Sequence, residues 1–425
     1  MHAFRTVPRR ILVVSFGPPD FDRNSGSLRF YSLLQILSQQ HEVTFYAPRR
    51  FYSPTERSDS RGQRYIDALT SLGIDVHFGP PTLLGSLLAR TDHSVFFEFF
   101  HTAEWALQFT RLHRPDLPIV VDSVDLAYVR QYRRVTYAPH RLTARIIASR
   151  TKHRELGIYG RADVVVVVTD NDRRTLLRAL PHARVAIVAN VHLVKEPVPD
   201  FRHRIPHSLL FVGHFEHNPN VDAMLWFCRS ILPLIRDRIP DGTLTIVGDS
   251  APPEVRALAG DGVNVAGWVP DLTPYLRSNC VSIAPLRFGS GMKGKIGEAM
   301  AAGLPVVTTT FGAEGMNLQH DITALIADSP HEFATAVVRL WTDPSLHAHV
   351  ARRGLEHVKQ NWSVGIVGQR LLEVINSLPS LRPKRATILE HLAARVWLPS
   401  SRVSSTLDRL YSVLRWYWSW SSRKS

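Results

Sequence analysis

The sequence contains little that would crosslink the chain or hold it across a membrane. Its 425 residues include only two cysteines, Cys228 and Cys280, which lie in apolar contexts without paired spacing. A disulfide framework and a thiolate metal site are therefore not expected. No apolar run reaches the roughly 18 residues that a spanning helix needs, and Ile11–Phe16 is too short for a signal-peptide core. We expect a cytoplasmic protein, either soluble or peripheral on the inner face of a membrane.

Acidic residues are scarce in two segments, and this accounts for the net charge of +14. From Arg130 to Arg154 there is no acid, and from Leu381 to Ser425 the only acids are Glu390 and Asp408. The remainder of the chain is close to neutral, so the charge predicts two basic patches. Their basic residues are Arg130, Arg133, Arg134, Arg141, Arg145, Arg150, Lys152 and Arg154 in the first, and Arg382, Lys384, Arg385, Arg395, Arg402, Arg409, Arg415, Arg423 and Lys424 in the second.

The C-terminal tail, residues 381–425, combines this charge with aromatic side chains. Apolar residues at helical spacing are followed closely by tryptophans: Leu407, Leu410, Tyr411, Leu414, Tyr417, and then Trp416, Trp418 and Trp420. An amphipathic helix of this kind suits the interface of an anionic bilayer. We expect the tail and Arg130–Arg154 to bind such a surface, with an ordinary solvated helix as the alternative for Arg130–Arg154. Nucleic acid is not an expected partner, because no binding motif accompanies either patch.

Apolar, β-rich runs alternate with amphipathic segments along most of the chain, which predicts parallel sheets covered by helices on both faces. The polar, proline-containing stretch Lys195–Asp200 divides the alternation into two lobes. We therefore expect an α/β fold with two doubly wound Rossmann-like domains, residues 1–195 and 201–360, that face a central cleft. The predicted strands are Ile11–Phe16, Glu42–Ala47, Ile74–Phe78, Ser94–Glu98, Ile119–Asp122, Asp163–Thr169 and Val185–Asn190, and then Leu209–Val212, Leu244–Val247, Val263–Ala266, Val281–Pro285, Val306–Thr309 and Ala324–Ala327.

The segment from Cys280 to Met316 is the most informative about chemistry. A predicted strand breaks at Gly289-Ser290-Gly291, and a helix-forming stretch with Lys293, Lys295 and Glu298 follows. Glycines allow the backbone to approach a ligand, while free amides at a helix N-terminus and two lysines attract negative charge. This pattern predicts a site for an anionic ligand.

Several motifs of the second lobe closely resemble the group-1 glycosyltransferases of GT-B architecture. They occur in the expected order between Ser208 and Ile375 and are Phe211-Val212-Gly213, Gly267-Trp268-Val269-Pro270-Asp271, Ala284-Pro285-Leu286, the stretch from Glu298 to Val307, and Gly312-Ala313-Glu314-Gly315. The first lobe resembles the family more weakly, through Asp22–Ser27 and Val121–Leu126. Asn361-Trp362-Ser363 and the helix after it resemble the family's closing segment, so we expect residues 361–380 to cross back to the first lobe.

The resemblance implies a retaining, hexosyltransferase-type enzyme that moves a sugar from a nucleotide-sugar donor to a glycan or lipid-linked acceptor. Bacterial-type cell-surface polysaccharide or glycolipid synthesis is the implied setting. The nucleotide-sugar is a co-substrate, and neither a cofactor nor a metal is implied. Glu298 matches the glutamate that hydrogen-bonds the ribose, Gly213 the glycine beside the diphosphate, and Val269 the loop that flanks the base.

The sequence also departs from the family pattern. Ser290 stands where many members have a glutamate near the donor sugar, and His214 and Pro219 stand in a region where many have an arginine and a lysine. A diphosphate without cationic partners is costly to bury. We infer that Lys293 and Lys295 replace the missing cations, with Arg287 as a further candidate, and that Gly289, Ser290 and Gly291 belong to the same donor site.

The acceptor side offers several candidates and no assigned base. The catalytic candidates are His101, Asp122 and Asp125. Asp122 ends a predicted strand of the first lobe, Asp125 lies in the loop after it, and His101 follows the preceding strand. Ser25-Gly26-Ser27 either contacts the acceptor or a phosphate, or simply caps a helix.

Other interpretations of these motifs remain open. Gly289 to Gly294 matches a GxGxxG dinucleotide fingerprint, although it follows the fourth strand of its lobe rather than the first. Asp170-Asn171-Asp172 matches a DxD metal motif or caps a helix. A nucleotide-sugar epimerase of the same architecture and a non-catalytic donor-binding relative are the alternative functions.

Overall fold

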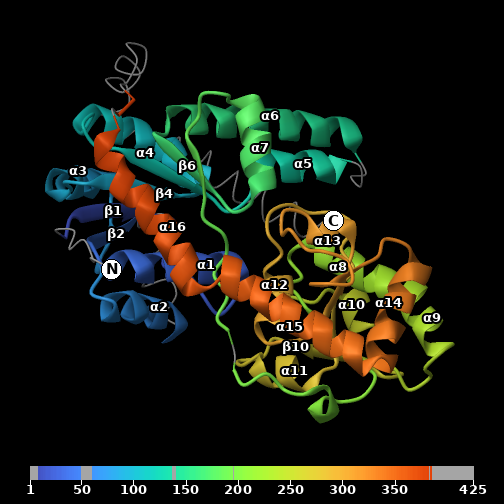
Figure 1. Cartoon of the computed structure of the whole chain (residues 1–425). Helices are drawn as coiled ribbons and strands as arrows, with labels where there is room; N and C mark the ends of the chain where they lie inside the picture. The colour runs from blue at the N-terminus through green and yellow to red at the C-terminus, as the bar shows by residue number, and fades with distance from the viewer. Residues whose placement is uncertain (1–7, 49–59, 136–139, 195, 382, 385–425) are drawn as a thin grey trace.

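The computed structural model describes residues 8–48, 60–135, 140–194, 196–381 and 383–384, and it consists of two α/β lobes (Figure 1). The first lobe contains a seven-stranded sheet and the second a six-stranded sheet, and every strand pairing is parallel. The predicted fold of two doubly wound domains is confirmed. The predicted tail helix lies outside the described residues.

The first-lobe sheet has the order β3-β2-β1-β4-β5-β6-β7. Its strands are β1 (Arg10–Val14), β2 (Glu42–Pro48), β3 (Asp75–Gly79), β4 (Ser94–Glu98), β5 (Ile119–Ser123), β6 (Val164–Val167) and β7 (Val185–Ile187). Its helices are α1 (Ser25–Ser38), α2 (Ser60–Ser71), α3 (Pro81–Arg90), α4 (Phe99–His113), α5 (Ala127–Val135), α6 (Arg141–Arg161) and α7 (Asp170–Ala179).

The second-lobe sheet has the order β10-β9-β8-β11-β12-β13. Its strands are β8 (Ser208–Val212), β9 (Thr243–Val247), β10 (Val263–Gly267), β11 (Val281–Ala284), β12 (Val306–Thr308) and β13 (Leu325–Ile326). Its helices are α8 (Asn218–Trp226), α9 (Leu232–Arg236), α10 (Pro253–Arg256), α11 (Thr273–Ser278), α12 (Gly294–Ala301), α13 (Thr310–Ala313), α14 (Pro330–Thr342) and α15 (Pro344–Asn361).

The strands are apolar on both faces because each face of the sheet packs against a separate core. On β1, Ile11 and Val13 belong to one hydrophobic cluster, and the alternating residues Leu12 and Val14 belong to another. Successive strand side chains point to opposite faces, so a continuous apolar run is what a sheet between two helical layers requires.

Two chain segments cross between the lobes and touch each other. The linker after β7 is one, and the passage from α15 to α16 (Val364–Ser377) is the other, with α16 lying along the first lobe near α1 (Figure 1). The backbone N–H of His192 in the linker donates to the carbonyl of Trp362 at 2.9 Å. Lys359 pairs with Glu196 across the same junction.

The lobes also share hydrophobic packing. One cluster of buried side chains includes Leu33 of α1, Ile296 of α12 and Leu371 of α16. Helix α12, which carries Lys295 and Glu298 and follows the predicted anion-binding loop, packs against α1 of the first lobe and against α15. The position of the candidate site therefore depends on how the lobes meet.

A glycine on α12 permits this contact. A Cβ added at Gly297 would lie 2.2 Å from Nε2 of His192, whose imidazole is buried in the linker. We predict that Gly297→Ala destabilises the protein by about 1–3 kcal/mol, the usual cost of overpacking, when measured by urea unfolding.

Gly365→Ala is the control for this substitution. Gly365 lies in α16, and an added Cβ there has no neighbour within 4 Å. Alanine favours helices over glycine by up to about 1 kcal/mol, so this variant should be as stable as the wild type or slightly more stable. Equal stability of Gly297→Ala and Gly365→Ala would contradict the proposed close contact.

Candidate active site

The loop Gly289-Ser290-Gly291 connects β11 to α12 and lies at the contact between the lobes. The backbone φ is +138° at Gly289 and +67° at Gly291, values that side-chain-bearing residues rarely adopt. A Cβ at Gly291 would lie 3.0 Å from the Cβ of Asp125 in the first lobe. Glycine therefore gives this loop both its shape and its close approach to the opposite lobe.

The two lysines after the loop are directed to different neighbours. Lys293 is the residue before the first turn of α12, and its Nζ donates to the carbonyl of Gly291 at 2.7 Å. Lys295 Nζ donates to Oδ1 of Asn220 at 2.5 Å and lies 4.2 Å from the ring centroid of Phe211. Both therefore lie at the N-terminal end of α12 and contact only neutral groups of their own lobe through these bonds.

Both lysines are poorly solvated. Burial lowers the pKa of Lys293 to about 8. Burial, together with the charge of Lys293, lowers the pKa of Lys295 to about 7. An anion that entered would restore the stability of the charged ammonium groups, because an opposite charge favours the protonated form. The N-terminal end of α12 adds the positive end of a helix dipole. This arrangement favours an anionic ligand such as a phosphate.

The other predicted donor residues lie around the same end of the second sheet. Gly213 follows β8, and its N–H donates to the carbonyl of Val247 at 2.9 Å. Val269 follows β10 and is partly buried, and Glu298 is a partly buried residue of α12. Arg287 pairs with Asp222 at 2.5 Å. The assignments of Gly213, Val269 and Glu298 to donor groups stay predictions.

A polar cluster that the sequence did not predict joins the lobes beside this site. His214 Nδ1 contacts the carboxylate of Asp249, and Arg23 of the first lobe is 3.2 Å from the same carboxylate. The guanidinium of Arg23 is also 5.5 Å from the ring centroid of Trp268, which precedes Val269. An arginine of the first lobe thus reaches the loop that is expected to flank the base.

Asp122 does not face a cleft, which corrects its place among the catalytic candidates. Its carboxylate accepts from Nη1 and Nη2 of Arg29 at 2.5 and 2.9 Å, and both side chains are fully buried. A buried carboxylate needs such a partner to remain charged. Asp122 therefore stabilises the interior of the first lobe.

Asp125 lies where the lobes meet. Its Oδ2 accepts from the hydroxyl of Ser290 at 2.6 Å and from Arg130 at 2.5 Å. The residue that replaces the family's glutamate thus contacts a carboxylate supplied by the other lobe. Asp125 remains a candidate for chemistry at the donor sugar.

His101 lies in the first turn of α4, with its ring centroid 3.8 Å from that of Phe100. Burial lowers the pKa of this partly buried imidazole to about 4. It is therefore neutral near pH 7, and its low pKa makes it a weak base.

Glu98 is a candidate that the sequence did not single out. It ends β4 and accepts a hydrogen bond from Ser15, which follows β1, at the point where the strand order of the first sheet reverses. Ligands of doubly wound sheets bind at this kind of position. Burial raises the pKa of Glu98 to about 8, so its carboxyl is largely protonated at neutral pH. The only feature of the sequence that could have indicated Glu98 as a site residue is its position at the end of a predicted strand.

The predicted acceptor segment forms the start of α1. Asn24 caps this helix through a 2.9 Å bond from the N–H of Ser27, while the Ser27 hydroxyl donates to Asp20 at 2.5 Å. A Cβ at Gly294 would lie 2.4 Å from the Cβ of Ser25. Gly26 lies between these residues, so Ser25-Gly26-Ser27 brings the N-terminus of α1 next to that of α12.

Asp170-Asn171-Asp172 forms the first turn of α7. The Thr169 hydroxyl accepts from the N–H of Asp172 at 3.0 Å and donates to its carboxylate at 2.6 Å, and Asp170 pairs with Arg173 and Arg174. These contacts favour the capping interpretation. Among the residues that the structure describes, no group of three His, Cys, Asp or Glu side chains is suitably placed for a metal.

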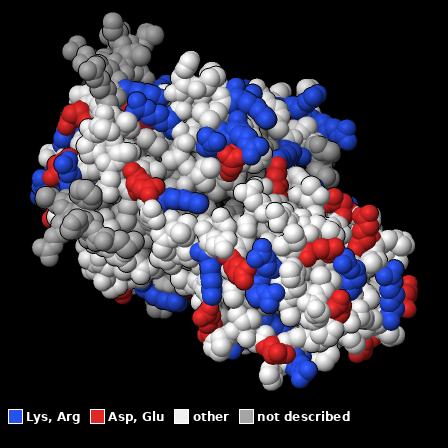
Figure 2. Space-filling view, in the orientation of Figure 1, with Lys and Arg blue, Asp and Glu red and all other residues white. Residues whose placement is uncertain are grey.

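The basic segment Arg130–Arg154 contains both ion-paired arginines and arginines that are exposed to solvent. Arg130 and Arg133 form ion pairs with Asp125 and Glu314, and Arg154 pairs with Glu104. Arg141, Arg145 and Arg150 on α6 are exposed. Figure 2 shows basic side chains over the part of the first lobe where α5 and α6 lie in Figure 1.

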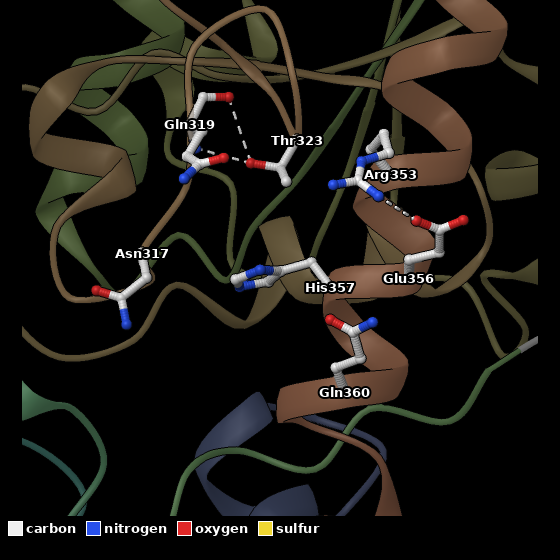
Figure 3. A pocket seen from close by; sticks show the side chains of 7 residues that line it. All are labelled: Asn317, Gln319, Thr323, Arg353, Glu356, His357 and Gln360. Atoms are coloured by element: carbon white, nitrogen blue, oxygen red, sulfur yellow. Dashed lines mark hydrogen bonds and ion pairs between the residues drawn. The ribbon is translucent and has the colours of Figure 1, made fainter.

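A separate hollow lies on the second lobe, between α15 and the loop after α13 (Figure 3). Within it, Arg353 pairs with Glu356 at 2.8 Å, and a ring nitrogen of His357 lies 3.0 Å from the carbonyl of Met316. Its lining residues are Asn317, Gln319, Thr323, Arg353, Glu356, His357 and Gln360. None of the predicted donor residues lines it, so it is distinct from the candidate site.

Comparison with known proteins agrees with the motifs of the second lobe. Residues 206–343 match the model of the family described as Glycosyl transferases group 1. The chain is 30% identical over 210 residues to phosphatidyl-myo-inositol mannosyltransferase of Mycolicibacterium smegmatis (strain ATCC 700084 / mc(2)155), a match that covers 47% of this chain and 54% of that protein. The chain spans about half or less of the length of the curated relatives that it matches.

Solved structures resemble the whole two-lobed arrangement. Sucrose-phosphate synthase from Thermosynechococcus elongatus has a TM-score of 0.66 at 17% identity and covers 88% of this chain and 99% of its own. Alr3699/HepE of Anabaena in complex with UDP has a TM-score of 0.60 at 14% identity, with 87% and 100% covered. At these identities the similarity establishes the fold, and the predicted GT-B architecture is confirmed.

The buried pair of Arg29 and Asp122 leads to a prediction. Arg29→Ala leaves Asp122 as an unpaired buried charge, and breaking such a pair typically costs about 3–5 kcal/mol. Urea unfolding should show a loss of this size. Arg10→Ala is the control, because its pair with Asp92 is about half exposed, at 51% and 45%, and should contribute at most about 1 kcal/mol. Similar losses in the two variants would contradict the structural role of Asp122.

Proposed function

We propose that this chain, whose second lobe is a group-1 glycosyltransferase domain, transfers a sugar from a nucleotide-sugar donor to a glycan or lipid-linked acceptor. The observation that carries the proposal is the position of Lys293 and Lys295 at the N-terminus of α12, inside the segment that matches the family. That end of α12 lies next to the N-terminus of α1, so two helix dipoles and two ammonium groups favour negative charge at one place.

In the proposed reaction, negative charge develops on the leaving nucleoside diphosphate. An acceptor hydroxyl oxygen bonds to the anomeric carbon, the bond from that carbon to the donor phosphate breaks, and the hydroxyl proton is released. The leaving nucleoside diphosphate gains negative charge, which Lys293, Lys295 and the amides of α12 stabilise. Because two lysines already neutralise this charge, we propose that the transfer proceeds without a metal.

We further propose that the transfer retains the anomeric configuration. In this course the acceptor attacks from the face that the diphosphate leaves, and the protein mainly orients the acceptor and stabilises the leaving group. Asp125 beside the glycine loop is the polar group of the first lobe that suits acceptor orientation. Ser15 and Glu98 at the reversal of the first sheet are buried, so they suit a supporting position behind the acceptor.

A membrane surface is the proposed location of the acceptor. Leu142 and Ile146 of α6 are 75% and 46% exposed, and they lie one helical turn apart among Arg141, Arg145 and Arg150. Exposed apolar side chains flanked by arginines suit the interface of an anionic bilayer. The similarity to a mannosyltransferase named for phosphatidyl-myo-inositol supports a lipid acceptor. Within the described residues, every helix is too short or too polar to cross a bilayer.

Thermal unfolding against a panel of nucleotide-sugars tests the donor site. A ligand that binds only the native state raises the melting temperature, and we expect one donor to do so in the wild type. Glu298→Ala should lose most of this shift because it removes the predicted ribose contact. Glu254→Ala, at an exposed position in the same lobe, should keep it. A panel without any effect on the wild type would contradict the proposed function.

Products of the stabilising donor distinguish the alternatives. Transfer predicts a new glycoside when a lipid or glycan acceptor is present, whereas an epimerase would convert the donor without an acceptor. A non-catalytic relative would bind the donor and release it unchanged.

Co-sedimentation with vesicles tests the membrane surface. Replacing Leu142 and Ile146 together by glutamate should lower binding to vesicles of anionic phospholipid by at least roughly tenfold, because it removes apolar contact and adds negative charge. Ile205→Glu is the control, since Ile205 is 53% exposed on the second lobe. Equal binding by the two variants would show that α6 does not contact the bilayer.

A further inference from the structure

An arginine of the first lobe contacts the glycine loop of the second. Nη1 of Arg133 on α5 donates to the carbonyl of Gly289 at 2.8 Å. The same guanidinium binds both oxygens of Glu314 at 2.7 and 2.6 Å, and lies 4.9 Å from the ring centroid of Phe311. Such a bidentate contact fixes the direction of both partners.

Further contacts from the first lobe hold the same region. Asn171 of α7 donates to Glu314 at 3.2 Å. Asp125, itself paired with Arg130, accepts from the hydroxyl of Ser290 at 2.6 Å. The loop is therefore held at two successive residues by groups that belong to the opposite lobe.

Glu314 is a competitor for Lys293. Nζ of Lys293 lies 5.3 Å from the centroid of Phe311, the ring that Arg133 also approaches. The charge of Glu314 favours the protonated lysine, and Arg133 opposes it. If Arg133 were absent, Glu314 would be a carboxylate without its bidentate partner beside a lysine that is proposed to bind phosphate.

We propose that Arg133 is a positioning residue of the donor site, which neutralises Glu314 and fixes the glycine loop so that Lys293 stays available for the diphosphate. This role rests on the proposed function of the second lobe. It makes the donor site a structure of both lobes, because the residue that keeps the lysine available comes from the first. Arg133 would then give a binding function to part of a basic segment in which Arg141, Arg145 and Arg150 are exposed on α6.

Binding of UDP, with GDP in a parallel arm, tests the role of Arg133. Arg133→Gln should weaken binding roughly 10- to 100-fold, the loss typical of a charged hydrogen-bonding group. In Arg133→Gln/Glu314→Gln the competing carboxylate is gone, so affinity should recover in part.

Arg134→Gln, one residue along α5, is the matched control and should bind like the wild type. Arg133→Lys, which keeps the charge but loses the bidentate contact, should lie between the wild type and Arg133→Gln.

The pH dependence separates this role from a merely structural one. Lys293 faces Glu314, Arg133, Asp172 and Asp125 from the elements around it, and Lys295 lies on its own helix. UDP affinity should fall as pH rises through the pKa of Lys295, about 7, and then through that of Lys293, about 8. Arg133 lowers the pKa of Lys293, so in Arg133→Gln the second part of the fall should move to higher pH. A change in loop packing alone would leave its position unaltered.

Three results would overturn the inference while leaving the donor site intact. They are wild-type affinity in Arg133→Gln, no recovery in the double variant, and an unchanged pH profile. The melting temperature of each variant without ligand shows whether it is folded. If Arg133→Gln is not folded, the affinity of Arg133→Lys is used to test the role of Arg133. Absence of any UDP or GDP effect on the wild type would instead contradict the proposed function, and the role of Arg133 with it.

Discussion

The close approach of first-lobe and linker side chains to the backbone of α12 and its preceding loop is the constraint on which the rest of the structure depends. An added Cβ would lie 3.0 Å from Asp125 at Gly291, 2.4 Å from Ser25 at Gly294 and 2.2 Å from His192 at Gly297. These first-lobe residues come from the loop after β5, the start of α1 and the linker. Larger residues on this stretch of α12 and its preceding loop would separate the lobes, because packed interiors lack the space to absorb them.

Because the two lobes approach each other closely at α12, charged side chains of both lobes lie near one another. Two helix N-termini and two lysines lie near each other, and burial lowers the pKa of both lysines. Three carboxylates close to this region pair with arginines: Asp122 with Arg29, Asp125 with Arg130, and Glu314 with Arg133. Arginine suits this task because it stays charged and can bind a carboxylate through two bonds. The centre of the molecule therefore favours an anion while these three acids are neutralised.

Much of the fold was predictable because its determinants are local. Each predicted strand overlaps an observed one, since an apolar run that is buried on both faces needs only its own residues to be recognised. The glycine loop and the lysines of α12 were predictable for the same reason. Asn24 as the cap of α1 and Thr169 as the cap of α7 are also short-range features.

The contacts between lobes were not predictable in this way. Arg133 and Glu314 are 181 residues apart, and nothing near either one indicates the other. In the sequence, Arg133 belongs to a run of basic residues, so its charge was assigned to the surface. Asp122 was taken for a cleft residue because it ends a strand, whereas its burial depends on Arg29, 93 residues earlier. Pairing across such distances is a property of the folded arrangement.

The contact between the lobes also explains why Ser290 can stand where many family members have a glutamate. A glutamate on the loop would place a carboxylate in the second lobe permanently, whether or not the lobes meet. Here the carboxylate beside Ser290 is Asp125 of the first lobe, so it reaches the loop only when the lobes are in contact. The second lobe alone lacks this carboxylate, and its contact with the first lobe supplies it. A donor site of the proposed kind would therefore be complete only where the lobes meet, a position that also keeps water away from the reacting groups.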